Sequence, residues 1–168
     1  IPLILRWPGR IPAGQRTDAL AQIHDLAAMV LSAAGCTEQE LEQWMPEAMD
    51  LGPVASGARG HEHAICCYRN SGINDQGVAW DPPLHCTMFR DDRFKLNVYH
   101  GEQLGELYDM QEDPQELNNL WDSPYHREVR LELTGKLAEW MFTQELGNDA
   151  RGGQALPDPR KRLVNALK

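Results

Sequence analysis

The chain has 168 residues, a formal net charge of −9 at pH 7 and 42% hydrophobic residues, which is enough for a packed core and argues against disorder. The acidic balance argues against nucleic acid and anionic membrane surfaces as partners, because binding to phosphates depends on clustered lysine and arginine. No apolar run approaches the ~18 residues that a membrane-spanning helix requires.

A buried strand is predicted at the start of the chain. Residues 1–5 form an apolar run that ends at the turn Pro8-Gly9. Natural domains seldom begin inside a buried strand, so we expect the chain to be a fragment whose upstream part is missing. Without neighbouring strands, Leu3, Ile4 and Leu5 should form an exposed apolar face, which favours a homodimer of the isolated chain.

Two helices are predicted next. The first spans about 18–34, with Thr17 or Asp18 as its N-cap and Gly35 at its C-terminal end. Its apolar stripe consists of Leu20, Ile23, Leu26, Ala27, Val30, Leu31 and Ala34. Thr37 and Glu40 have capping-box spacing, which predicts a second helix that Pro46 ends. Residues 50–60 are rich in Gly, Ala and Ser and read as a loop.

The hydrophobic pattern then changes to the alternation typical of strands. An apolar run from His63 to Asn70 predicts one strand, and residues 71–83 read as a long loop. Residues 84–89 and 94–99 alternate around a tight turn and predict a β-hairpin. Residues 106–110 add a short strand, so an antiparallel sheet of three to four strands is expected.

Two helix starts follow the sheet. Asp113, Pro114 and Glu116 have the order of an N-cap, a first and a third helical residue. Ser123-Pro124 should begin a longer helix that packs across the sheet through an apolar stripe of Val129, Leu133, Leu137, Trp140 and Met141. The chain becomes polar after Gly147 and is expected to run over the surface.

The four cysteines do not form a metal-binding pattern. Cys36, Cys66, Cys67 and Cys86 include no pair separated by two residues, which argues against a structural zinc site made of thiolates. We interpret them as free thiols, which favours a reducing compartment such as the cytoplasm.

The order of these elements resembles the C-terminal portion of the sulfatase family. Five segments carry the resemblance, and they follow one another as in that family over residues 1–142. They are Ile1-Pro2-Leu3-Ile4 with Arg6-Trp7-Pro8-Gly9; Ile11-Pro12-Ala13-Gly14; His24-Asp25-Leu26 with Ala34-Gly35; Arg90-Asp91-Asp92-Arg93-Phe94-Lys95-Leu96; and Gly105-Glu106-Leu107-Tyr108-Asp109-Met110 with Asp113-Pro114, Glu116 and Asn119-Leu120.

The resemblance implies an α/β hydrolase of the alkaline-phosphatase superfamily that cleaves small sulfate esters. Its nucleophile is a formylglycine made in a Cys/Ser-x-Pro-x-Arg motif, and its cofactor is a divalent cation, usually calcium. The implied fold class is α+β: a small antiparallel sheet with a long C-terminal helix, plus a strand and a helix from the end of the main domain. The implied divisions are 1–60, the end of the main domain; 61–146, the sheet subdomain; and 147–168, a polar tail.

The catalytic apparatus of that family is missing from this sequence. Cys86-Thr87-Met88-Phe89-Arg90 has the Cys-to-Arg separation of the formylglycine motif but lacks its proline and falls in a predicted strand. The Asp91-Asp92 pair falls in a predicted turn, and no set of oxygen ligands for calcium is apparent. We therefore expect no catalytic residue, metal ligand or cofactor in this chain, which alone should be inactive and should depend on an upstream sulfatase main domain as its partner.

Two groups of polar residues are still assigned roles from the resemblance. The first borders the substrate cleft as rim candidates: His61, His63, Arg69, Asn70 and His85. The second is a structural signature that should hold turns and sheet edges: Arg90, Arg93, Lys95, Glu106, Tyr108, Asp109, Asp113, Pro114, Glu116 and Asn119.

Two other functions fit the same residues. The first is a phosphonate or phosphate monoester hydrolase of the same superfamily. The residues that distinguish such an enzyme from a sulfatase lie upstream of this chain, so this alternative stays open. A non-catalytic binding or assembly module would reuse the fold without chemistry, and a gene with an upstream Cys/Ser-x-Pro-x-Arg motif would exclude it.

Overall fold

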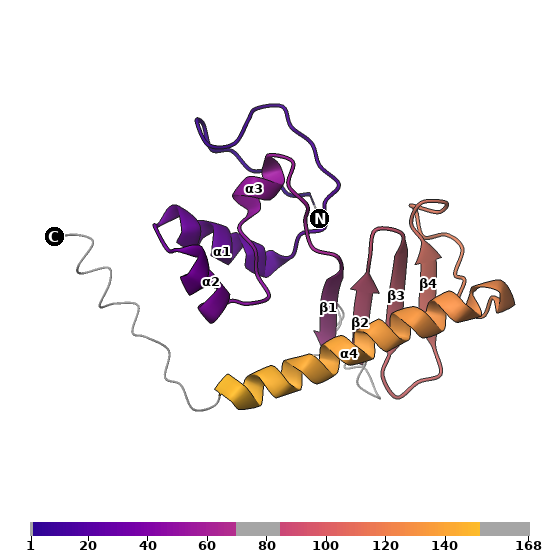
Figure 1. Ribbon diagram of the computed structural model, residues 1–168. Coiled ribbons are helices and arrows are strands. Elements are labelled where there is room, and N and C mark those ends of the chain that lie inside the picture. Colours follow the sequence, from indigo (N-terminus) through magenta and orange to yellow (C-terminus); the bar gives the residue numbers. More distant parts are fainter. Residues whose placement is uncertain (1, 70–84, 152–168) are drawn as a thin grey trace, which may run out of the picture. The chain divides into compact units, whose positions relative to one another are not determined.

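The computed structural model describes residues 2–69 and 85–151, with side chains up to residue 143 apart from that of Arg69. Figure 1 shows the elements, which are α1 (Ile23–Ala33), α2 (Glu38–Trp44), α3 (Leu51–Ala55), β1 (Ala64–Arg69), β2 (His85–Arg90), β3 (Phe94–Tyr99), β4 (Gly105–Asp109), η1 (Pro124–His126) and α4 (Arg127–Arg151). The chain divides into two compact units, residues 1–135 and 136–168.

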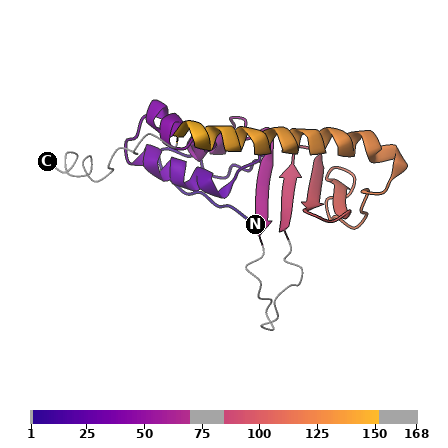
Figure 2. The same ribbon diagram turned by 90° about the horizontal axis from the view of Figure 1, so that it is seen from below.

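The four strands form one antiparallel sheet in the order β1-β2-β3-β4, and Figure 2 shows them side by side. In the register, Phe89 faces Ile65 on one side and Leu96 on the other, and Leu96 faces Leu107. Phe89, Leu96 and Leu107 are buried because they share the inner face of the sheet. The sheet and the C-terminal helix confirm the predicted α+β fold class.

The turn between β2 and β3 is the predicted hairpin. The carboxylate of Asp91 accepts hydrogen bonds from the backbone N–H groups of Arg93 at 2.9 Å and Phe94 at 2.7 Å. The backbone of Asp91 also donates to the carbonyl of Phe94 at 3.0 Å. Aspartate therefore closes the turn in the way that short polar side chains usually do.

Helix α1 begins five residues later than predicted, so the N-caps expected at Thr17 and Asp18 are wrong. Leu20 instead forms an isolated antiparallel bridge with His61, which keeps the chain extended up to Gln22. The helix ends as predicted. Gly35 has φ +96°, and the bonds of a Schellman motif run from Gly35 to Ser32 and from Cys36 to Leu31.

The inward face of α1 also differs from the predicted stripe. Ile23 is 84% exposed and Val30 is 66% exposed, whereas Asp25 and Ala28 are fully buried. The orientation of the helix follows from Asp25, whose carboxylate is bonded to Gln22, Met49 and His61, all outside the helix. A polar contact therefore decides which side of this helix faces the core.

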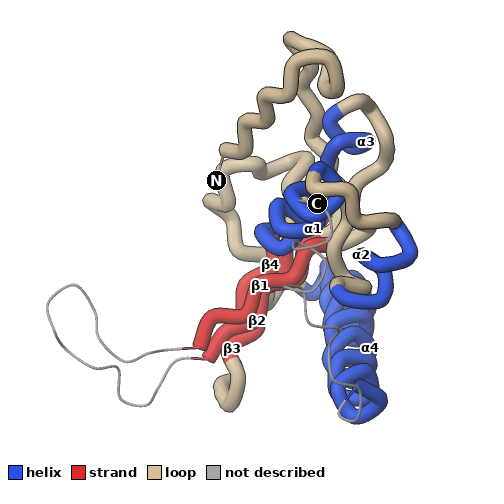
Figure 3. The backbone as a smooth tube through the Cα atoms, turned by 90° about the vertical axis from the view of Figure 1, so that its left-hand side faces the viewer, coloured by secondary structure: helices blue, strands red, loops and turns tan. Residues whose placement is uncertain are grey.

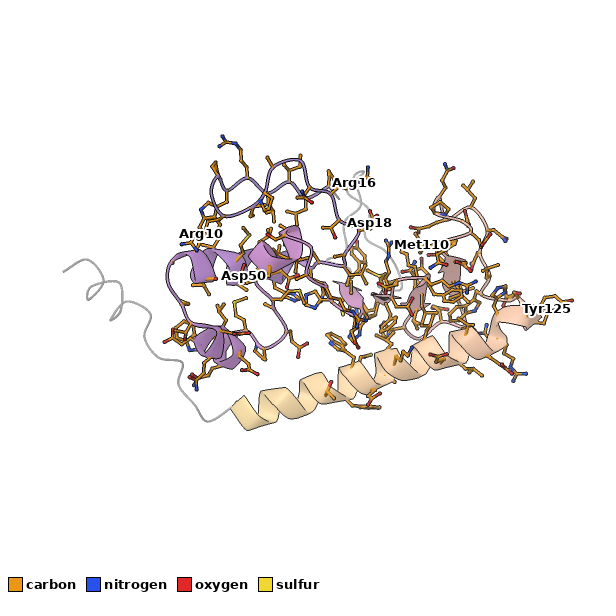
Figure 4. All side chains as sticks on the ribbon, turned by 45° about the horizontal axis from the view of Figure 1, so that its top comes forward. Arg10, Arg16, Asp18, Asp50, Met110 and Tyr125 are labelled. Carbon is orange, nitrogen blue, oxygen red and sulfur yellow. The ribbon has the colours of Figure 1, made fainter. Side chains whose placement is uncertain are left out.

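Helices α2 and α3 follow α1, and Figure 3 shows the three helices in blue. Thr37 and Glu40 form the predicted capping box: Thr37 Oγ1 accepts from the backbone of Glu40 at 3.4 Å, and Glu40 Oε2 accepts from that of Thr37 at 3.0 Å. Helix α3 lies where a loop was predicted. Asp50, labelled in Figure 4, caps it by accepting from Gly52 N at 2.8 Å, and Leu51 and Val54 are buried.

The predicted strand at residues 1–5 is wrong. Residues 2–19 form no strand, and the segment turns at Trp7, whose carbonyl accepts from Arg10 and Ile11. No strand in the described part of the chain pairs with it, and an isolated strand leaves its backbone groups unsatisfied. The exposure expected there holds for Leu3 at 49% and Ile4 at 89%, whereas Leu5 is half-buried.

The first of the two predicted helix starts after the sheet is also wrong. Glu116 has φ +58°, a left-handed conformation that ends any helix begun at Asp113. The second start is confirmed, because η1 and then α4 follow Ser123-Pro124, and Leu133 on α4 is buried. No helix among the described residues is long and apolar enough to cross a bilayer.

Candidate functional site

One polar cluster ties β4 to the hairpin between β2 and β3. Asp109 is 4% exposed, and its Oδ2 accepts from Arg93 Nε at 3.0 Å and from Arg93 Nη2 at 2.7 Å. Its Oδ1 accepts from the backbone of Gln111 and Glu112. The Arg93 guanidinium and these backbone donors hold the pKa of Asp109 below its ordinary value. The arrangement satisfies a buried carboxylate.

A second cluster lies on the opposite face of the sheet. Glu106 accepts from Asn97 Nδ2 at 2.5 Å and from the Tyr99 hydroxyl at 3.2 Å. Burial, followed by the nearby charge of Glu106, raises the pKa of Tyr99 and of Tyr108. Both phenols therefore stay protonated at neutral pH, and the Tyr99 hydroxyl acts as a hydrogen-bond donor to Glu106.

The loop after β4 is fixed by three of the signature residues. Lys95 Nζ donates to Glu116 Oε2 at 2.5 Å. Asn119 Oδ1 accepts from the backbone of Leu107 and Trp121, both at 3.0 Å, and its amide donates to Gly105 O at 3.1 Å. The side chain of Asn119 thus acts as an extra partner for the edge strand β4.

Other signature residues have less definite partners. Asp113 accepts from Asn118 N at 2.8 Å and Pro114 follows it in the turn. The Nε of Arg90 is buried without a hydrogen-bond partner among the described residues. The signature residues that have partners bond to turns, strands and each other, which is what a fold-stabilising role requires.

The rim candidates separate into two places. Arg69 and His85 are register partners at the end of β1 and the start of β2, and the side chain of His85 is exposed. His63 lies near the other end of β1 and stacks on Phe89, with ring centroids 5.1 Å apart. Asn70 lies outside the described residues.

His61, the fifth rim candidate, is committed to a carboxylate. Its Nε2 lies 2.9 Å from both oxygens of Asp25, which is fully buried on α1. His24, the neighbour of Asp25 in sequence, places its own Nε2 3.8 Å from Asp25 Oδ1. The sequence offered no signal for this cluster, because His24-Asp25 and His61 are separated by 36 residues.

The segment Cys86–Arg90 lies in β2, not at the start of a helix. Burial, followed by the charge of Glu106, raises the pKa of the Cys86 thiol, and a thiol in that state is a poor nucleophile at neutral pH. The only cluster of metal-capable side chains found in the described part is His24, Asp25 and His61. Two imidazoles and one carboxylate do not fit calcium, which takes six to eight oxygen ligands.

Comparison with known proteins aligns this chain with one part of longer proteins. The sequence profile described as N-sulphoglucosamine sulphohydrolase, C-terminal, matches residues 1–143. An ulvan-active sulfatase of Formosa agariphila is 22% identical over 86% of this chain and 33% of its own length. The chain therefore spans about a third of this curated relative.

Solved structures share the fold. A protein in complex with its substrate D-glucosamine-2-N,6-O-disulfate has a TM-score of 0.66 at 24% identity, covering 89% of this chain and 29% of that one. A phosphonate monoester hydrolase of Agrobacterium radiobacter has a TM-score of 0.58 at 20% identity, covering 78% and 27%. Because the profile for the C-terminal region of N-sulphoglucosamine sulphohydrolase matches residues 1–143, which is most of the chain, this chain belongs to the sulfatase family and corresponds to its C-terminal region.

Proposed function

We propose that this chain is the C-terminal portion of a sulfatase that cleaves sulfate esters, and that the portion upstream supplies the nucleophile and the cation. The observation that carries the proposal is the family match over residues 1–143 in a chain that spans about a third of a curated relative. The raised pKa of Cys86 supports it as well, since that thiol is poorly suited to attack an ester.

The substrate class we favour is a sulfated carbohydrate. The names of two similar proteins support it, since one acts on ulvan and the other is bound to a disulfated glucosamine. An arylsulfatase-like activity on simple aromatic sulfate esters is the corresponding laboratory assay for the complete protein.

Within the complete enzyme, we assign Arg69, Asn70 and His85 to the rim of the substrate cleft. Arg69 and His85 are paired at one end of the sheet, and arginine and histidine are suited to recognise sulfate oxygens. His61 and His63 are the weaker candidates, because one is bonded to Asp25 and the other stacks on Phe89.

The experiment is a comparison of the complete protein with the isolated chain. We expect the complete protein to release sulfate from an aryl sulfate and the isolated chain to release none. Mass spectrometry of peptides from the complete protein should show formylglycine in an upstream Cys/Ser-x-Pro-x-Arg motif. A complete protein that lacks this motif and is inactive would instead be a non-catalytic binding module.

The rim assignment has its own test. Arg69→Ala and His85→Ala in the complete protein should raise the KM for a sulfated sugar and change kcat less, since they contact bound substrate away from the reacting atoms. Arg59→Ala is the matched control, because Arg59 is exposed and pairs only with exposed Glu62 at 3.6 Å among the contacts described. An equal effect of all three substitutions would contradict the assignment.

A phosphonate monoester hydrolase is the second candidate function. Two solved structures of such enzymes, from Agrobacterium radiobacter and Silicibacter pomeroyi, share the fold with TM-scores of 0.58 and 0.60. Parallel assays of the complete protein with a sulfate ester and a phosphonate monoester separate the two functions.

A further inference from the structure

Three metal-capable side chains from separate segments converge beside α1. His24 and Asp25 lie in the first turn of the helix, and His61 lies three residues before β1. One ring nitrogen of each histidine and a carboxylate oxygen of Asp25 all lie within 4.8 Å of one another. Imidazole and carboxylate groups are the ligands that zinc takes in many protein sites.

A backbone carbonyl adds a fourth donor to this group. Glu47 O lies 3.0 Å from His24 Nε2, His61 Nε2 lies 2.9 Å from Asp25 Oδ1, and His24 Nε2 lies 3.8 Å from the same oxygen. Ligands of a tetrahedral zinc ion with bonds of about 2.0–2.1 Å are roughly 3.4 Å apart. The observed distances fall on both sides of this value, so small side-chain movements would complete the site.

The carboxylate at the centre is already held in place. Asp25 Oδ2 accepts from Gln22 N at 2.6 Å, and Asp25 Oδ1 accepts from Met49 N at 3.0 Å. Such outer bonds orient metal ligands and strengthen binding. The Asp25 side chain is fully buried, that of His61 is 14% exposed and that of His24 is 36% exposed, so the group is open to solvent on the His24 side.

We propose that His24, Asp25 and His61 bind a zinc ion, with Glu47 O or water as the fourth ligand. The ion takes the place of two hydrogens, the one that His61 Nε2 shares with Asp25 and the one that His24 Nε2 donates to Glu47 O, and each imidazole can carry its hydrogen on Nδ1 instead. It joins α1 to the segment that leads into β1, so its role is structural.

The test is zinc titration of the metal-free chain by calorimetry. We expect one ion per chain, and a rise in Tm of about 5–10 °C at a zinc concentration 100 times the Kd. His24→Ala should weaken binding by at least about 10-fold. This variant is suited to the test because His24 is partly exposed and Asp25 keeps its bonds to Gln22, Met49 and His61. With cobalt in place of zinc, the absorption spectrum should be that of a tetrahedral site.

His85→Ala is the control, since His85 is exposed and lies at the far end of β1 and β2 from His61. It should bind zinc as tightly as the unaltered chain. The proposal is overturned if the unaltered chain binds no stoichiometric zinc, if His24→Ala binds as tightly as the unaltered chain, or if His85→Ala weakens binding to the same extent.

Discussion

The helical region α1–α3 and the sheet β1–β4 each contain a buried aspartate, but they satisfy it with different partners. Asp25 accepts from two backbone N–H groups and one imidazole, and these come from Gln22, Met49 and His61. Asp109 accepts from the guanidinium of Arg93 and from the backbone N–H groups of Gln111 and Glu112 in the turn that follows it.

The two carboxylates differ in the sequence separation between the aspartate and its hydrogen-bonding partners. Asp25 joins groups 24 and 36 residues away, so it organises three segments at once. Asp109 joins a hairpin residue 16 positions away and otherwise closes its own turn. Loss of Asp25 should cost more stability than loss of Asp109, because the His61 side chain is only 14% exposed whereas that of Arg93 is 53% exposed and can bond to water instead.

Asp25→Ala should give the largest effect. The free energy of unfolding should fall by roughly 4 kcal/mol. Met49 N and His61 lose a buried acceptor, and the backbone N–H of Gln22, the N-cap residue of α1, loses the carboxylate that accepts from it. Denaturant unfolding measures this loss. Asp18→Ala, which changes an exposed aspartate (Figure 4), should cost less than about 0.5 kcal/mol. Equal losses of unfolding free energy in the two variants would contradict the prediction that the buried contacts of Asp25 stabilise the fold.

Gly105→Ala should be the next largest effect, and it acts on the sheet. A Cβ at this position would lie 2.2–2.4 Å from three atoms of the Trp121 ring, which therefore has to move. The guanidinium of Arg130 lies 4.8 Å from that ring and would lose its contact. We expect a loss of about 2–3 kcal/mol in thermal or denaturant unfolding.

Gly135→Ala is the matched control for that substitution. Gly135 is in a helix, and a Cβ there would meet no atom within 4 Å apart from its two chain neighbours and the backbone of its own helix. Alanine should stabilise the helix by up to about 1 kcal/mol. A loss of stability in this variant would show that the alanine substitution itself, and not the Trp121 contact, lowers the stability of Gly105→Ala.

Asp109→Asn should have a smaller effect that depends on pH. The pKa of Asp109 is below its ordinary value of 3.8 in the folded chain, so the carboxylate stabilises the fold at pH values above 3.8. That stabilisation is lost as the pH falls through the lower folded pKa. The unaltered chain should therefore lose more stability than Asp109→Asn when Tm is followed from pH about 5 to about 2. Parallel curves for the two chains would contradict the role given to Arg93.

Thr37→Ala should have the smallest effect, about 1 kcal/mol, because it removes the hydroxyl that accepts from Glu40 N at the start of α2. Thr17→Ala should cost less, since Thr17 caps no helix and accepts only from Ala19 N at 3.1 Å in the described contacts. Denaturant unfolding of the two variants distinguishes a real N-cap from one that sequence alone suggested.

The sheet was predictable from sequence because one strand is a compact apolar run, the hairpin strands alternate, and Asp91 closes the turn between them. The cap of α2 was predictable for the same reason, since Thr37 and Glu40 lie within one turn. The rotation of α1 was not, because Asp25 contacts Met49 and His61, which are distant in sequence. The hydrophobic stripe of α1 indicated the wrong face, because a buried polar contact outweighed it.

The predicted helix at Asp113 failed for a similar reason. The local order of Asp113, Pro114 and Glu116 is that of a helix start, but Lys95 from β3 binds Glu116, which has a left-handed backbone conformation. The rim candidates were suggested by the resemblance alone. The register pairs Arg69 with His85, which the sequence did not predict, and the function of both residues stays a prediction.

The measurement that tests the central claim most directly is kcat/KM of the complete protein on 4-nitrophenyl sulfate and on a 4-nitrophenyl phosphonate monoester, with the isolated chain assayed beside it. A C-terminal portion of a sulfatase predicts a higher kcat/KM on the sulfate ester and no turnover by the isolated chain. Preference for the phosphonate ester, or hydrolysis by the isolated chain, would contradict the account.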